Sequence, residues 1–151
     1  MSTTELETNK AQFRRTYEEM FNQGNLTNVD ELIAHDCINH EVPPGMNNCG
    51  PEAIRQVVIM LRTAFPDLHF TIEELVAERG TVAGRVTMSG THLGPFMGIA
   101  PTGRSFRQAQ VHFVRFRDGK GVEHRAVRDD LGLMQQLGVI PAPAHEYVPE
   151  G

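Results

Sequence analysis

The 151-residue chain has no tryptophan, only two cysteines and no long hydrophobic run. Two cysteines are too few for a disulfide framework, which fits a protein of the reducing cytoplasm. No apolar run approaches the roughly 20 residues that span a membrane, and because residues 1–10 are polar we expect no signal peptide. The net charge is −5 and there is no basic run, so the chain lacks the cluster of positive charge that binds the phosphate backbone of nucleic acids. We expect a cytoplasmic protein that binds neither membranes nor nucleic acid.

Motifs of several enzyme classes are also absent. The sequence has no G-x-S-x-G, no P-loop and no G-x-G-x-x-G between a strand and a helix, so nucleophilic triads, phosphoryl transfer and nicotinamide binding have no support. Four side chains near one another in the sequence raise the question of a zinc-dependent hydrolase: His35, Cys37, His40 and Cys49. Their spacing matches no usual zinc pattern. We therefore expect no metal.

The composition that remains is that of an ordinary globular protein, with 40% hydrophobic and 22% charged residues. At this length the chain is most simply one domain with one core. Capping-box patterns starting at Thr4 and Asn28 predict two helices, and Pro51 at a helix start predicts a third. Apolar residues at helical spacing follow each start. A last helix follows Arg128 and is ended by Gly138.

Between the third and the last helix the hydrophobic period changes to two, as in half-buried strands. Four strands joined by hairpins are predicted: one from Leu68 to the turn at Arg79-Gly80, then 81–92, 105–117 and 122–128. Helices segregated on one face of a curved antiparallel sheet form an α+β domain, and a curled sheet leaves an apolar cavity between the layers. The domain spans residues 1–138, and the Pro-rich residues 139–151 form an irregular C-terminal arm.

The predicted hairpin loop in segment 90–104 (GTHLGPFMGIAPTGR) is unusually apolar. Surface turns normally use small polar residues because their side chains face water. Here the loop carries Leu93, Phe96 and Met97, which suggests that it folds over a cavity. The pattern is typical of a lid over a small-molecule pocket.

Alternation along the strands 105–117 and 122–128 places Gln110, His112 and His124 on the cavity side. An unperturbed histidine has a pKa of about 6.5, so His112 is able to act as acid or base at neutral pH, or it is a hydrogen-bonded core histidine. The opposite face carries apolar side chains mixed with arginines, which suits an interface between the sheets of two copies. We expect a homodimer through this outer sheet face.

Two further polar groups lie at predicted element boundaries. Asn39 follows the second helix and is able to donate a hydrogen bond to a substrate carbonyl or enolate oxygen, although a loop asparagine often bonds its own backbone. Asp129 or Asp130 caps the last helix, and the other carboxylate is free to face the cavity mouth, where burial would make it a usable base.

Several of these segments resemble the SnoaL-like polyketide cyclases of the nuclear-transport-factor-2-like superfamily. The resemblance runs from about Glu5 to Gly138 and rests on the 90–104 hairpin, Gln110-Val111-His112, Asp118-Gly119-Lys120, Glu123-His124-Arg125 and Leu137-Gly138. It implies a cone-shaped α+β barrel and a cofactor-free enzyme. The family's characterised cyclases close the last ring of anthracyclines by an intramolecular aldol condensation of a polyketide methyl ester. A carboxylate removes a proton alpha to a carbonyl, and a histidine and an asparagine assist the oxygen atoms.

The resemblance assigns the histidine to His112 and the asparagine to Asn39, but the family's catalytic aspartate falls on Ala126. An alanine cannot abstract a proton, and losing a positioned base costs about 10²- to 10⁴-fold in rate. Three interpretations remain open. Either His112 or Asp129 has taken over as base, or the protein is a cofactor-independent hydroxylase of polyketides from the same family, or it only binds a hydrophobic ligand.

Our leading hypothesis is a cyclase-type enzyme that acts on a hydrophobic carbonyl or aromatic polyketide-like molecule by general acid/base chemistry. His112 is its principal acid/base, Asn39 donates to the developing enolate, and Asp129 is a secondary base or orients a histidine. The substrate-binding residues are expected to be Gln110, His124, Phe65, Leu93, Phe96, Met97, Phe116 and Ala126.

Overall fold

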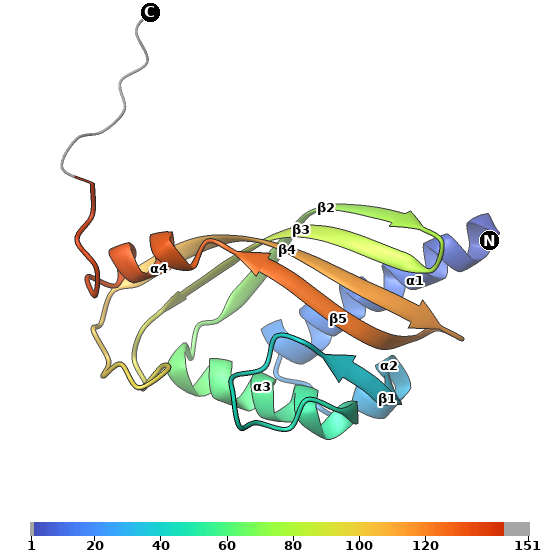
Figure 1. Ribbon diagram of the computed structural model, residues 1–151, viewed down its shortest axis with the longest axis horizontal. Coiled ribbons are helices and arrows are strands. Elements are labelled where there is room, and N and C mark those ends of the chain that lie inside the picture. The colour runs from blue at the N-terminus through green and yellow to red at the C-terminus, as the bar shows by residue number, and fades with distance from the viewer. Residues whose placement is uncertain (1, 144–151) are drawn as a thin grey trace, which may run out of the picture.

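The computed structural model describes residues 2–143, which form helices packed against one sheet (Figure 1). The N-terminal half contains the helical segments α1 (Thr3–Arg15), η1 (Thr16–Asn22) and α2 (Val29–Leu32), strand β1 (Ile33–Asn39) and helix α3 (Gly50–Ala64). The C-terminal half contains strands β2 (His69–Glu78), β3 (Thr81–Thr91), β4 (Ser105–Arg117) and β5 (Lys120–Arg128), and helix α4 (Asp130–Gln136). The predicted α+β class is confirmed. Of the arm predicted at 139–151, residues 144–151 lie outside the described part of the chain.

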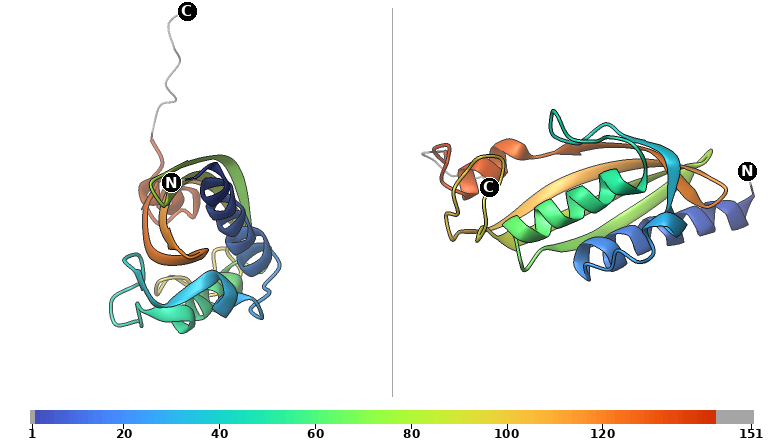
Figure 2. Two further views of the ribbon diagram at one scale, coloured as in Figure 1. Left: turned by 90° about the vertical axis from the view of Figure 1, so that its right-hand side faces the viewer. Right: turned by 90° about the horizontal axis from the view of Figure 1, so that it is seen from below.

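The five strands form one sheet in the order β1-β5-β4-β3-β2. Strands β2 to β5 pair antiparallel with their sequence neighbours, whereas β1 runs parallel to β5 at one edge. The sheet curves without closing, and α1 and α3 lie across its concave side (Figure 2). The concave face of the sheet and these two helices therefore enclose the interior of the domain.

Strand β1 corrects the predicted layout, in which only four antiparallel strands form the sheet. Helix α2 ends at Leu32, and the chain continues directly into the extended β1. Asn39 at the end of β1 pairs with His124 of β5, two residues that stand 85 positions apart. Because the partner strand is so distant in sequence, local periodicity contains no signal for this pairing.

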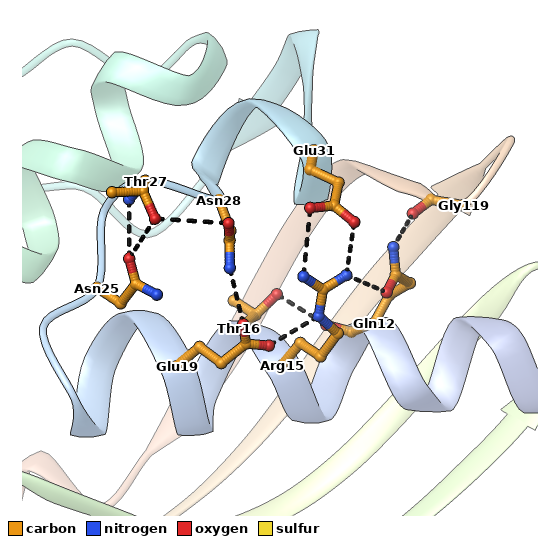
Figure 3. Close-up of polar contacts among 9 residues, drawn as sticks. All are labelled: Gln12, Arg15, Thr16, Glu19, Asn25, Thr27, Asn28, Glu31 and Gly119. Atoms are coloured by element: carbon orange, nitrogen blue, oxygen red, sulfur yellow. Dashed lines mark hydrogen bonds and ion pairs between the residues drawn. The ribbon is translucent and has the colours of Figure 1, made fainter.

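The helix starts also differ in detail from the prediction. The capping box of α1 is formed by Ser2 and Glu5, two positions before the pattern that starts at Thr4. The side chain of Asn28 makes no cap bond to α2. Its amide donates instead to Glu19 at 2.8 Å, and this contact joins η1 to the start of α2 (Figure 3).

A cluster of charged and amide side chains ties the N-terminal helix to its neighbours (Figure 3). Arg15 donates to Glu19 at 2.7 Å and to Glu31 at 2.9 Å. Gln12 donates at 3.0 Å to the carbonyl of Gly119, which lies in the turn between β4 and β5. These contacts fix the helical wall of the domain against α2 and the turn between β4 and β5.

The close approach of α1 to the sheet depends on a glycine in β3. Phe13 is fully buried, and a Cβ atom at Gly84 would collide with its ring and with Leu75. Gly84 pairs with His112 of β4. One helical turn beyond Phe13, Tyr17 therefore reaches His112, and the two ring centroids are 5.1 Å apart.

Candidate active site

A cavity of about 340 Å³ lies between the concave face of the sheet and the helices. Its wall is mostly apolar and includes Phe21, Ile54 and Leu61 from the helical side. Seven residues predicted from the sequence line it: Asn39, Phe96, Met97, Gln110, His112, Phe116 and His124. The predicted lid therefore contributes Phe96, which is buried, and Met97, which is largely exposed.

Four predicted site residues lie elsewhere. Phe65 is fully buried in the core, where its ring packs against Phe96 with the centroids 5.0 Å apart. Leu93 is 58% exposed and does not line the cavity, and Ala126 of β5 does not line it either. Asp129 is the N-cap of α4, and its Oδ1 accepts a hydrogen bond from a backbone amide of that helix at 2.9 Å.

A row of hydrogen-bonded polar side chains crosses the sheet side of the cavity. His112 Nδ1 lies 2.8 Å from His124 Nε2, and His124 Nδ1 lies 2.8 Å from Asn39 Oδ1. In the other direction, His112 Nε2 lies 2.6 Å from Gln110 Oε1, and Gln110 donates to Gln108 at 2.7 Å. Strands β1, β5 and β4 thus bring together four predicted site residues, and Gln108, which shares the alternation of Gln110 and His112, extends the row.

Neighbouring groups fix the orientation of the amides at both ends of this row. Gln108 Nε2 donates at 3.1 Å to the backbone carbonyl that precedes α4, so its oxygen faces Gln110. Gln110 in turn presents its own oxygen to the histidines. At the other end, Asn39 Oδ1 accepts from the backbone amide of Glu41 at 2.9 Å. Both ends of the histidine pair therefore meet hydrogen-bond acceptors.

The pair of His112 and His124 makes three contacts that each require a proton. The contacts with Gln110 and Asn39 face oxygen acceptors, and the contact between the two rings joins two nitrogens. Two neutral imidazoles carry only two N–H groups for these three contacts. Burial lowers the pKa of His112 well below its ordinary value and that of His124 to about 4, and the charge of Arg128 acts in the same direction. The pair is therefore neutral at neutral pH, and one contact is left without a proton. The row therefore holds two ring protons for three contacts.

Two polar groups in the cavity wall, Asn39 Nδ2 and the Tyr17 hydroxyl, have no hydrogen-bond partner within residues 2–143. The oxygen of Asn39 is already held by His124 and by the Glu41 amide, so its NH₂ group is left to donate to a ligand. Burial raises the pKa of the Tyr17 hydroxyl well above its usual range, so this group stays protonated. Donors held in apolar surroundings suit a carbonyl oxygen that becomes an oxyanion during a reaction.

An ion pair that the sequence analysis did not identify also lines the cavity. Glu41 Oε1 accepts from the backbone amide of Ala126 at 2.9 Å, and Glu41 Oε2 accepts from Arg128 at 3.3 Å. Glu41 lies in the turn that follows β1, where strand alternation gives no signal for side-chain direction. Arg128 shares the alternation that places His124 on the cavity side.

Within residues 2–143, no group of three His, Cys, Asp or Glu side chains is placed to hold a metal ion. Cys37 is buried and Cys49 exposed, and both are free thiols. None of the described helices is long and apolar enough to cross a membrane.

Comparison with known proteins places this site in a family context. Residues 11–137 match the family model of the SnoaL-like polyketide cyclases. Nogalonic acid methyl ester cyclase of Streptomyces nogalater is 36% identical over 119 residues, which cover 78% of this chain and 89% of the relative. Aklanonic acid methyl ester cyclase of Streptomyces sp. strain C5 is 35% identical over 128 residues, which cover 82% of this chain and 78% of the relative.

Solved structures agree with these relatives. IdmH of Streptomyces antibioticus matches with a TM-score of 0.73 and 35% identity, over 86% of this chain and 98% of its own. AclR of Streptomyces galilaeus, a proposed hydroxylase, matches with a TM-score of 0.77 and 30% identity, over 92% of this chain and 87% of its own. The resemblance seen in the sequence is confirmed, and the chain belongs to the family of SnoaL-like polyketide cyclases.

Proposed function

We propose that the protein is a cofactor-free enzyme that catalyses an intramolecular aldol condensation of a hydrophobic, polyketide-like carbonyl compound. The observation that carries the proposal is the free NH₂ group of Asn39, which is held at the end of the histidine row and has no protein partner within residues 2–143. The cyclase activities of the relatives support the reaction class. The apolar wall of the cavity supports a hydrophobic substrate.

In this proposal the carbonyl oxygen of the substrate accepts a hydrogen bond from Asn39 Nδ2. A base removes the proton from the adjacent carbon, and the enolate oxygen is stabilised by the same donor. The enolate carbon attacks a second carbonyl carbon of the same molecule, which forms a carbon–carbon bond and an alkoxide. The alkoxide then takes up a proton, so the product is an isomer of the substrate.

His112 and His124 form the acid/base row of this reaction. Because both are neutral at neutral pH, they are able to take a proton or a hydrogen bond from a substrate hydroxyl at the contact that lacks one. Gln110 orients His112. Asp129 acts at a distance, because its carboxylate caps α4 and its backbone carbonyl orients Gln108.

We also propose that two copies associate through the outer face of the sheet. Phe113 of β4 is 44% exposed and Val127 of β5 is 70% exposed on this face. Arginines such as Arg115 lie among them, and a mixture of apolar and guanidinium groups is typical of the surfaces that proteins bury against one another.

A second candidate function is cofactor-independent hydroxylation. The similarity to AclR supports it, as does the alanine at position 126. The two functions differ in their products, because a hydroxylase adds an oxygen atom to the substrate whereas an aldol condensation leaves its composition unchanged.

The test is to incubate the protein with an aromatic polyketide methyl ester that carries the two required carbonyl groups, in buffer with a metal chelator. We expect a product of unchanged mass with a new ring, and no change in rate on addition of the chelator. A product that gains oxygen supports the hydroxylase, and tight binding without any product supports a ligand-binding role. Either result contradicts the proposed cyclisation.

A further inference from the structure

We propose that Glu41 is the base that removes the proton from the substrate carbon. The inference rests on the proposed function and names the group that this function requires. Neither the histidine row nor Asp129 supplies a carboxylate in the cavity wall, whereas Glu41 does so from the segment that follows β1.

Only two carboxylates, Glu41 and Asp130, belong to the cavity wall among the described residues. Asp130 is exposed, lies in the first turn of α4 and accepts from Gln108 at 3.0 Å, at the end of the row that is remote from Asn39. The Glu41 side chain is only 24% exposed and lies at the Asn39 end. Position therefore favours Glu41.

The contacts of Glu41 hold its carboxylate in place without using up its acceptor capacity. One oxygen accepts from the Ala126 amide and the other from Arg128, so each oxygen bears one hydrogen bond from the protein. A carboxylate oxygen has two lone-pair positions, which leaves one on each oxygen for a substrate proton. The ion pair with Arg128 anchors the group at the wall of the cavity.

Glu41 also contacts Asn39, the proposed donor to the enolate oxygen. Its backbone amide donates to Asn39 Oδ1 at 2.9 Å and so helps to turn Asn39 Nδ2 towards the ligand space. Proton removal beside a carbonyl requires a base near the carbon and a donor near the oxygen, and these two atoms are one bond from the carbonyl carbon. Residues 39–41 supply both groups from one short segment.

The backbone amide that holds the Glu41 carboxylate belongs to Ala126. Ala126 stands opposite His112 in the β4–β5 pairing, between His124 and Arg128 on β5. The Glu41 carboxylate reaches its backbone amide, so an aspartate at position 126 would put a second carboxylate close to the first. Ala126 itself is outside the cavity wall, so an aspartate there would restore a carboxylate beside the position that Glu41 occupies in the wall.

The step balances within the substrate and Glu41. The carboxylate takes the proton from the carbon, and the electron pair of the C–H bond becomes the enolate, whose oxygen is bound by Asn39. After the carbon–carbon bond forms, the carboxylic acid of Glu41 returns the proton to the alkoxide and is regenerated as a carboxylate. No oxidant, metal or co-reactant takes part.

The test compares turnover of the aromatic polyketide methyl ester by the wild type, Glu41→Gln, the double variant Glu41→Gln/Ala126→Asp, and Glu123→Gln as control. Glutamine keeps the acceptor for the Ala126 amide, and Glu123 is a β5 carboxylate whose partners are His40 and Arg115. We expect Glu41→Gln to lower kcat about 10²- to 10⁴-fold, the double variant to regain at least about tenfold, and the control to match the wild type. Circular dichroism and Tm of each variant verify folding.

The outcomes separate the two proposals. If the wild type converts the ester and a folded Glu41→Gln variant does so at the same rate, the assignment of Glu41 is overturned while the proposed function stands. If Glu41→Gln loses activity and Ala126→Asp restores none, the side chain acts through its ion pair with Arg128 rather than as the base, which also overturns the assignment. If the wild type yields no cyclised product, the proposed function fails and the assignment of Glu41 fails with it.

Discussion

Glu41 Oε1 lies 2.9 Å from the backbone nitrogen of Ala126, so the segment after β1 delivers a carboxylate to the middle of β5. The family resemblance predicts the catalytic aspartate at this position of β5, where the chain has alanine. The contact places an acidic group near the expected one but anchors it on a different element. Glu41 is therefore the only carboxylate next to Asn39 in the described cavity wall, although it does not belong to β5.

Replacement of Asn39 tests the donor to the enolate oxygen. We expect Asn39→Ala to lower kcat about 10²- to 10³-fold, because the oxyanion loses a preorganised hydrogen bond in an apolar cavity. KM should change less than kcat, since the bond strengthens as charge develops. Steady-state kinetics measure both values. Asn48→Ala, an exposed asparagine outside the cavity wall, is the matched control. Equal kcat values for both variants would contradict the role of Asn39.

The histidine pair predicts a loss of stability towards acid pH. Burial holds the pKa of His124 at about 4 in the folded protein, whereas an unfolded histidine titrates at about 6.5. The unfolded chain therefore binds more protons between these values, so the free energy of unfolding falls as the pH drops through this window and is unaffected by His124 above it. The expected loss from His124 between pH 7 and pH 5 is about 2 kcal/mol.

Urea unfolding at several pH values measures this dependence. His124→Gln should flatten the slope between pH 6.5 and pH 5, whereas replacement of the exposed His69 by glutamine should leave it unchanged. A wild-type free energy of unfolding that stays constant over this range would mean that the folded histidines are as easily protonated as unfolded ones.

Phe113 provides a test of the proposed dimer. A glutamate at this position puts a charge in the outer face of the sheet, and a charge buried without a partner is costly. We expect Phe113→Glu to sediment as a monomer and the wild type as a dimer. Leu131→Glu, at an exposed apolar position on α4, should remain dimeric. Sedimentation of the wild type as a monomer at high concentration would exclude this interface.

Gly84→Ala tests the packing of α1 on the sheet. The added methyl group collides with the Phe13 ring, so we expect a loss of about 1 to 3 kcal/mol in the free energy of unfolding. Phe13→Leu in the same chain frees space and should make the double variant less destabilised than the sum of the two single changes. Additive losses would show that the two side chains do not share this contact.

Local pattern predicts much of the sheet and most residues of the polar row. The alternation that predicts a strand over 105–117 coincides with β4, and it places Gln110 and His112 on the cavity side because side-chain direction in a strand is a local property. The apolar loop predicts the contribution of Phe96 to the cavity wall, because burial of its apolar side chains is more favourable than their exposure to water.

The remainder of the site depends on contacts between distant segments. Strand β1 forms by pairing with β5, and without it Asn39 and Glu41 have no defined direction relative to the cavity. The histidine pair faces an oxygen at each end because backbone groups of Asp129 and Glu41 set the orientations of the Gln108 and Asn39 amides. Leu93 remains exposed although it belongs to the same loop as Phe96, because only the folded loop decides which apolar side chain turns inward.

The central claim is that Glu41 removes a proton from carbon, and deuterium exchange measures this step directly. Wild type and Glu41→Gln are each incubated in D₂O with an analogue that keeps the acidic carbon and lacks the second carbonyl group, so that no ring is able to form. We expect the wild type to exchange hydrogen for deuterium at that carbon and Glu41→Gln to exchange it at least about 10²-fold more slowly. Exchange at equal rates by both proteins would contradict it.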